Sequence, residues 1–148
     1  QDLDKNTFLT LRRLEAKLDY YFNQKVKSDP ELLIYETLFN QFPLGVAITD
    51  ISGEIITANE KLCEILNGSK EEIITNKANW YYVSSENRKY LMEQIISSGN
   101  VSNYEVEIKR RDLKIIWINL NMKKIIFRNQ EYIISIVQDI TELKQAGL

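Results

Sequence analysis

The last third of the chain constrains the fold most, because it carries three strand-like segments in succession. Residues 101–110 and 115–127 alternate side chains with the period of a β-strand that has one buried face. Residues 132–139 are rich in β-branched side chains and contain neither Gly nor Pro. Short polar turns at 111–114 and 128–130 separate the segments. The sequence therefore predicts three consecutive strands.

A shorter strand pair and three short helices precede these strands. Residues 45–50 and 54–58 flank a Ser-Gly turn, which predicts a β-hairpin. Asn59 can cap a short helix over residues 60–66, and Ser69 with Glu72 forms a capping box for a second over 70–74. Ser84 or Ser85 can cap a third helix over 85–97. This arrangement of strands and helices is typical of the α+β class.

Two helices are predicted ahead of the first strand. The first covers residues 5–27, with a short apolar seam at Leu11, Leu14, Leu18 and Tyr21. Two interpretations stay open, because so short a seam is marginal alone: a dimer helix that continues from an upstream domain, or a helix that packs on its own domain. Asp-Pro-Glu at 29–31 begins a second helix, which runs to about Gln41. We expect Leu38 and Phe39 to belong to the same dimer or capping surface.

The 148 residues contain no histidine. This excludes His-ligated zinc, Ser-His and Cys-His triads, an axial His on haem and a phospho-accepting histidine. No other acid–base motif is present, so we expect no catalytic residue and no metal site, and a small α+β enzyme is the weakest alternative. The net charge of −2 gives no sign of nucleic-acid binding. The apolar runs are far too short for a membrane span, so no membrane contact is expected.

Cys63 is the single cysteine of the chain. An internal disulfide is therefore impossible, and a reducing, cytoplasmic setting is expected. We interpret Cys63 as a small residue of the core or its boundary rather than as a redox group.

The final strand runs directly into a helix start. Asp139 can cap a helix, and Glu142 three residues later completes a capping box of the Asp-x-x-Glu type. A strand that continues into a helix at the chain end can pass strain from a core to a downstream element. We therefore expect Asp139 and Thr141 to form a signal junction.

Six motifs in this order resemble those of PAS domains, a family of sensory modules, over about residues 31–143. The first three are an entry helix with a first strand (ELLIYETLFN at 31–40 and GVAITD at 45–50), a second strand that ends in Asn59, and a helix with the sequence SKEEI at 69–73. The other three are SENR at 85–88, the strand residue Trp117, and the terminal Asp139-Ile-Thr141. The departures from the family pattern, at Asn67-Gly68, Thr75 and Ser85, lie in loops.

The resemblance implies a PAS fold: a five-stranded antiparallel sheet of order 2-1-5-4-3, with short helices on one face and an N-terminal helical extension. It divides the chain into an amphipathic linker or dimer helix over 1–28, a PAS domain over 29–141 and the start of an output helix over 142–148. The other face of the sheet is too apolar for contact with water. We expect the helix over 30–41, or a second protomer, to cover it.

Strand alternation, combined with the family pattern, yields a candidate ligand pocket. Its residues are Ala47, Thr49, Asn59, Trp80, Tyr104, Ile108, Ile118, Leu120, Ser135 and Val137. The side chains of Ala47, Thr49 and Ser135 are small, which favours a cavity with hydroxyl anchors. The alternative is a core that helix residues such as Leu62 and Ile95 fill.

The resemblance also argues against two cofactors, and the cofactor stays unknown. Flavin domains of the light-oxygen-voltage type carry a reactive Cys where Ala78 stands. Their flavin-binding amides are replaced by Ile108, Ile118 and Val137, which cannot form those hydrogen bonds. Haem-binding PAS domains typically use His, which is absent. Trp80 can stack on a ring ligand or serve as a core aromatic residue.

The resemblance implies a non-catalytic sensory or relay domain of a multidomain bacterial signalling protein, of the histidine kinase or diguanylate cyclase type. The expected partners are a second copy of the chain, a downstream effector domain and a small-molecule ligand. The alternative function is a ligand-free dimerisation and spacer module with a filled core.

Overall fold

The computed structural model describes residues 9, 12, 13, 16 and 30–147. The chain divides into two compact units, Gln1–Leu38 and Phe39–Leu148. The predicted seam at Leu11, Leu14, Leu18 and Tyr21 lies outside the described residues. Whether this seam forms a dimer helix or packs on its own domain is not tested. The domain boundaries at 28/29 and 141/142 also stay predictions.

Helix α2 (Pro30–Gln41) begins at the proline that the sequence predicts as its first residue. Leu33, Ile34 and Tyr35 on this helix are exposed. Leu38 is also exposed and Phe39 is half-buried. Their expected part in a dimer or capping surface stays a prediction.

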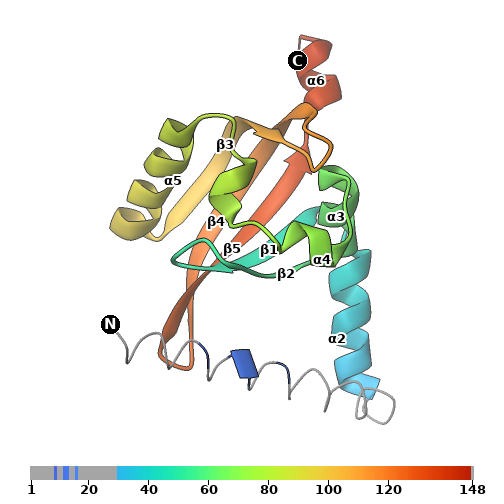
Figure 1. Cartoon of the computed structure of the whole chain (residues 1–148), viewed down its shortest axis with the longest axis vertical. Coiled ribbons are helices and arrows are strands. Elements are labelled where there is room, and N and C mark those ends of the chain that lie inside the picture. Colours follow the sequence, from blue (N-terminus) through green and yellow to red (C-terminus); the bar gives the residue numbers. More distant parts are fainter. Residues whose placement is uncertain (1–8, 10–11, 14–15, 17–29, 148) are drawn as a thin grey trace. The chain divides into compact units, whose positions relative to one another are not determined.

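The second unit is built on one antiparallel sheet (Figure 1). Its strands are β1 (Gly45–Asp50), β2 (Ile55–Ala58), β3 (Asn100–Lys109), β4 (Ile115–Phe127) and β5 (Gln130–Asp139). Their order is β2-β1-β5-β4-β3, which confirms the predicted topology. The last strand is therefore the central one, paired with β1 on one side and β4 on the other.

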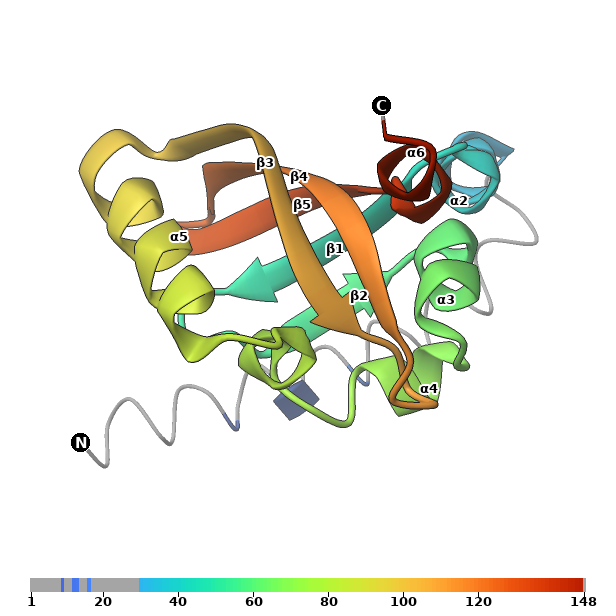
Figure 2. The same ribbon diagram turned by 90° about the horizontal axis from the view of Figure 1, so that it is seen from above.

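The helices between β2 and β3 pack on one side of this sheet (Figure 2). They are α3 (Glu60–Leu66), α4 (Lys70–Ile73), the 3₁₀ helix η1 (Ala78–Tyr81) and α5 (Ser85–Ser98). Asn59 caps α3, and Ser69 with Glu72 forms the predicted capping box of α4. Gly99 ends α5 in the left-handed conformation, with a φ of 74°.

The hydrophobic core lies between these helices and the inner face of the sheet. Ile73, Leu91 and Ile95 from the helices are fully buried, as is Ile133 of the central strand. They pack with the inward-facing side chains of β3 and β4, whose alternation the sequence shows. This packing explains why β3 and β4 have one apolar face and one more polar face.

The last helix, α6 (Thr141–Gln145), begins one residue after the position that a cap at Asp139 predicts. Ile140 occupies the cap position, and its side chain makes no capping hydrogen bond. The predicted capping box of Asp139 and Glu142 is therefore wrong. The Asp139 carboxylate instead accepts hydrogen bonds from the backbone and the hydroxyl of Thr141, at 3.0 and 2.6 Å. No helix among the described residues is long and apolar enough to cross a membrane.

Candidate functional site

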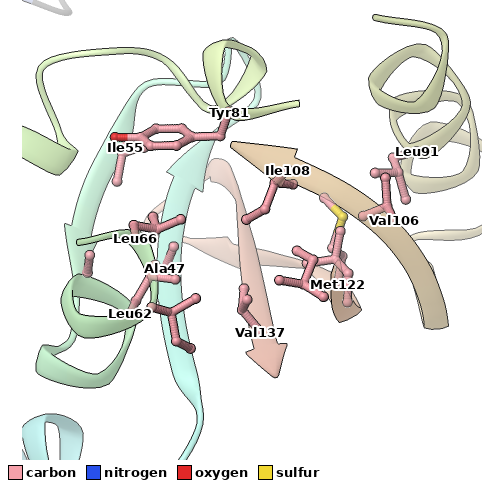
Figure 3. Close-up of a cluster of buried hydrophobic side chains, with 14 of the residues drawn as sticks. Ala47, Ile55, Leu62, Leu66, Tyr81, Leu91, Val106, Ile108, Met122 and Val137 are labelled. Carbon is pink, nitrogen blue, oxygen red and sulfur yellow. The ribbon is translucent and has the colours of Figure 1, made fainter. Parts of the chain in front are cut away.

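A cavity of about 60 Å³ lies between the inner face of the sheet and the helices. Its walls come from all five strands, from α3, η1 and α5, and from Tyr82 between the last two. It is lined by Ala47, Thr49, Ile55, Leu62, Leu66, Ala78, Tyr81, Tyr82, Arg88, Ile108, Ile118, Leu120, Ser135 and Val137. In Figure 3, Ile108 and Val137 face Leu66 and Ala47 across this region.

Small side chains on two neighbouring strands border the open space. Ala47 of β1 is paired with Ser135 of β5, and both line the cavity. Larger side chains at these two positions would reach toward the helices, because both lie on the inner face of the sheet. The structure places most of the sequence-predicted pocket residues at the cavity: Ala47, Thr49, Ile108, Ile118, Leu120, Ser135 and Val137.

Asn59 does not line the cavity but is fully buried as a structural residue. Its Oδ1 atom accepts hydrogen bonds from the backbone N–H groups of Val46 and Leu62, at 2.8 and 3.0 Å. Its Nδ2 atom donates to the carbonyl oxygens of Phe39 and Leu44, both at 3.0 Å. Asn59 therefore ties the end of α2 and the start of β1 to α3.

Trp80 also lies outside the cavity lining. Its ring packs edge-on against Tyr81, and the Lys109 ammonium and Arg111 guanidinium lie 4.4 and 5.0 Å from its centre. These contacts join η1 to the β3–β4 hairpin through cation–π interactions. Trp80 therefore serves as an aromatic residue at the edge of the core.

Tyr104 is the third predicted pocket residue that does not line the cavity. Its ring stacks on Tyr90 at 5.4 Å, and its hydroxyl donates a hydrogen bond to Asn87 Oδ1 at 3.1 Å. Tyr104 therefore fastens α5 to β3, because Tyr90 and Asn87 both belong to that helix.

Several cavity residues escaped the sequence interpretation, among them Tyr81, Tyr82 and Arg88. Burial raises the pKa of the Tyr82 phenol, although the nearby Arg88 acts in the opposite sense. Burial likewise raises the pKa of Tyr81, whose hydroxyl donates to the Ile73 carbonyl at 2.6 Å. Both phenols are therefore neutral hydrogen-bonding groups near neutral pH.

Cys63 is half-buried at the edge of the core and does not line the cavity. Burial raises the pKa of its thiol, and this effect outweighs the opposing influence of Lys70. The residue is thus predominantly a thiol near neutral pH. Among the described residues, no group of three or more Cys, Asp or Glu side chains could hold a metal ion.

The predicted junction residues connect the end of β5 to β4. The Thr141 hydroxyl accepts a hydrogen bond from the Trp117 amide at 3.1 Å and donates one to Asp139 at 2.6 Å. The Ile140 amide donates to the Trp117 carbonyl at 2.9 Å. Thr141 thus holds the first turn of α6 against the sheet.

A residue one turn further along α6 makes a second connection to the sheet. Lys144 Nζ lies 2.9 Å from a Glu105 carboxylate oxygen and 4.6 Å from the centre of the Trp117 ring. Glu105 belongs to β3 and Trp117 to β4. The start of α6 is therefore held by contacts to two strands, although the sequence interpretation assigned no role to Lys144.

Comparison with known proteins identifies the family. A family model described as PAS domain matches residues 43–142. The sensor protein TdiS of Thauera aromatica is 23% identical over 119 residues, which cover 75% of this chain. The matched region spans only 22% of TdiS, so the chain corresponds to about a fifth of that relative.

Solved structures share the fold at low sequence identity. A PAS domain from a two-component sensor histidine kinase has a TM-score of 0.67 at 12% identity, over 76% of this chain and 98% of that one. A PAS domain from Colwellia psychrerythraea has a TM-score of 0.66 at 22% identity, over 75% and 98%. A PAS domain in complex with ethanol, from a LuxR-family regulator of Burkholderia thailandensis, has a TM-score of 0.59 at 18% identity, over 72% and 96%.

PAS domains are generally non-catalytic sensory modules of signalling proteins, and such modules often dimerise. The sheet order, the helices on its inner face and the match over residues 43–142 all agree with this family. The chain is a PAS domain and belongs to the PAS family.

Proposed function

We propose that this PAS domain senses a small molecule in its cavity and passes the change to α6. The proposal rests on the position of β5, which lines the cavity and also carries the residue that anchors the last helix. Ser135 and Val137 of β5 line the cavity, and Asp139 at the end of the same strand binds Thr141. A ligand that shifts β5 against its neighbours also shifts the anchor of the last helix.

The mechanism is a population shift between two positions of α6. A ligand can move this equilibrium only if it binds one state more tightly than the other. The contacts of Thr141 with Trp117, and of Lys144 with Glu105, are the ones that the shift would alter. The output helix would then begin with α6 (Thr141–Gln145).

The full protein that we propose is a bacterial histidine kinase. Support comes from the sensor protein of Thauera aromatica and from PAS domains of histidine kinases that share the fold. Residues 1–148 contain no histidine, so the phospho-accepting residue would belong to another part of that protein. A diguanylate cyclase output, and a cytoplasmic location, stay predictions without a further supporting observation.

We also propose a homodimer. On the outer face of the sheet, Ile48 of β1 is paired with Ile134 of β5, and Val46 of β1 is paired with Ile136 of β5. Leu33 and Leu38 of α2 are exposed apolar side chains. Burial of such groups on association is favourable by about 25 cal/mol per Å² of apolar surface before the entropic costs. Light scattering tests the dimer directly, with the Leu38→Glu variant expected to be monomeric.

A small-molecule screen separates the sensor from the ligand-free spacer. Native mass spectrometry of the chain 1–148 would detect a ligand retained from expression, and a thermal-shift panel of metabolites would detect one that is lost. A compound that raises the melting temperature, and fails to do so when Ser135→Leu fills the cavity, supports the sensor. The ligand-free spacer is favoured if no compound in the panel raises the melting temperature and mass spectrometry detects no retained ligand.

A further inference from the structure

A single cationic side chain lines the otherwise uncharged cavity. Arg88 of α5 is half-buried, and its guanidinium carbon lies 5.6 Å from the centre of the Tyr82 ring. A Cβ atom built on Gly53 would stand 3.4 Å from Arg88 Nη2, so the guanidinium also reaches the turn between β1 and β2. The side chain is therefore held between an aromatic face and a backbone turn, beside the cavity.

The positive charge of Arg88 has no carboxylate partner within the described part of the chain. The ion pairs found there join Lys61 to Glu64, Arg110 to Asp112, Lys124 to Glu131 and Lys144 to Glu105. The cavity lining also contains no Asp or Glu. A guanidinium that is partly removed from water without a counter-charge favours an anion beside it, and its planar fork matches a carboxylate in particular.

The other residues that line the cavity, and its volume, determine the polarity and size of the ligand. Ile108, Leu120 and Val137 offer apolar contacts. Hydroxyl groups come from Thr49, Ser135, Tyr81 and Tyr82. One water molecule needs about 10–15 Å³ on the same volume scale, so the cavity of about 60 Å³ has room for about four to six non-hydrogen atoms. A phosphate ion meets the size but would turn several oxygens toward apolar side chains, which costs free energy for each unsatisfied oxygen.

We propose that the cavity binds a short-chain monocarboxylate, with its carboxylate on Arg88 and its alkyl end against Ile108, Leu120 and Val137. The size range corresponds to acetate, propionate and butyrate. This inference rests on the proposed sensory function and specifies the ligand class of the same cavity. Neither the family match nor the related sensor protein assigns this ligand class or a role for Arg88.

Calorimetric titration of the chain 1–148 with propionate and with propionamide tests the proposal, since the two probes have nearly the same shape and differ in charge. We expect propionate to bind at least tenfold more tightly. Arg88→Met, which keeps the length of the side chain and removes its charge, is expected to lower propionate affinity at least tenfold. The matched control is Arg128→Met, because Arg128 lies 5.2 Å from the Phe127 ring in an exposed turn and should leave affinity unchanged.

Two further measurements keep the test decisive if Arg88→Met folds poorly. Circular dichroism reports whether the variant is folded, and Ser135→Leu, which retains Arg88, should abolish propionate binding by filling the cavity. Equal affinity for propionate and propionamide, or unchanged affinity in a folded Arg88→Met, would overturn the carboxylate class while leaving a sensor of other ligands intact. If propionate fails to bind but a neutral compound stabilises the domain, the monocarboxylate class is also wrong. If no compound of any charge binds, both the monocarboxylate class and the proposed sensory function are wrong.

Discussion

Ala47 of β1 lies directly opposite Ser135 of β5, and the two side chains line the same cavity. This pair joins the first strand of the domain to its last, at the centre of the sheet. Because neither side chain extends far beyond its Cβ atom, the helices that pack above them leave about 60 Å³ open. The proposed sensory function depends on this space being available to a ligand.

Ala47→Leu is predicted to fill the cavity and abolish ligand binding at little cost in stability. The added side chain enters existing space, so we expect the free energy of unfolding to change by less than about 1 kcal/mol. The matched control is Ala58→Leu, since Ala58 is paired with Ala47 and buried but does not line the cavity. Overpacking there should cost about 1–3 kcal/mol. Equal losses in both variants, measured by urea unfolding, would indicate a filled core.

Asn59→Ala is predicted to destabilise the domain strongly. The substitution leaves two backbone N–H groups and two carbonyl oxygens without their side-chain partner in a fully buried setting. We expect a loss of about 3 kcal/mol in urea unfolding, since each unsatisfied buried group costs about 1–3 kcal/mol and some will rearrange. Asn79→Ala, at an exposed position, is the control. A loss below about 1 kcal/mol would contradict the bridging role of Asn59.

The Asp112 carboxyl is predicted to titrate well below its ordinary range. A hydrogen bond from the Arg110 side chain lowers its pKa from 3.8 to about 2. Because the pKa is lower in the folded state, the stabilising contribution is present above about pH 4 and is lost as pH falls toward 2. Carbon NMR of the Asp112 carboxyl checks the value. Arg110→Gln should raise this pKa toward 3.8, and an unchanged pKa would rule out Arg110 as the cause.

Local signals in the sequence were sufficient to predict most of the fold. The bounds of β4 follow from its side-chain alternation, and the Ser69 capping box places α4, because both signals involve neighbouring residues. The capping box of Asp139 and Glu142 was mispredicted because the Asp139 carboxylate binds the backbone and hydroxyl of Thr141. Thr141 also binds Trp117, 24 residues away, which no local pattern reports.

The cavity residues on the strands could largely be predicted from the sequence, whereas those on the helices could not. Alternation along β1, β4 and β5 predicts which side chains face inward, and the structure places them there. Arg88 reaches the cavity only because α5 docks beside the β1–β2 turn at Gly53, a contact between distant segments. Asn59 was correctly predicted to cap α3. Its bonds to Phe39 and Leu44 depend on the tertiary arrangement and could not be predicted.

Occupation of the cavity is proposed to reach α6 through the end of β5. Amide hydrogen exchange in the chain 1–148 tests this proposal most directly, with and without saturating propionate or whichever compound stabilises the domain most. The informative amides are those of Ile140 and Lys144, which bond to the carbonyls of Trp117 and Ile140. Thr141→Val removes the hydroxyl that joins α6 to β4, and Thr141→Ser keeps it.

Bound ligand is predicted to change amide exchange at Ser135 and Val137 and also at Ile140 and Lys144. In Thr141→Val, the change at Ile140 and Lys144 should disappear while the change at the cavity persists, and Thr141→Ser should behave like the unaltered chain. Ligand-dependent exchange that stops at the cavity in the unaltered chain, with Ile140 and Lys144 unaffected, would show that β5 does not transmit occupation of the cavity to α6.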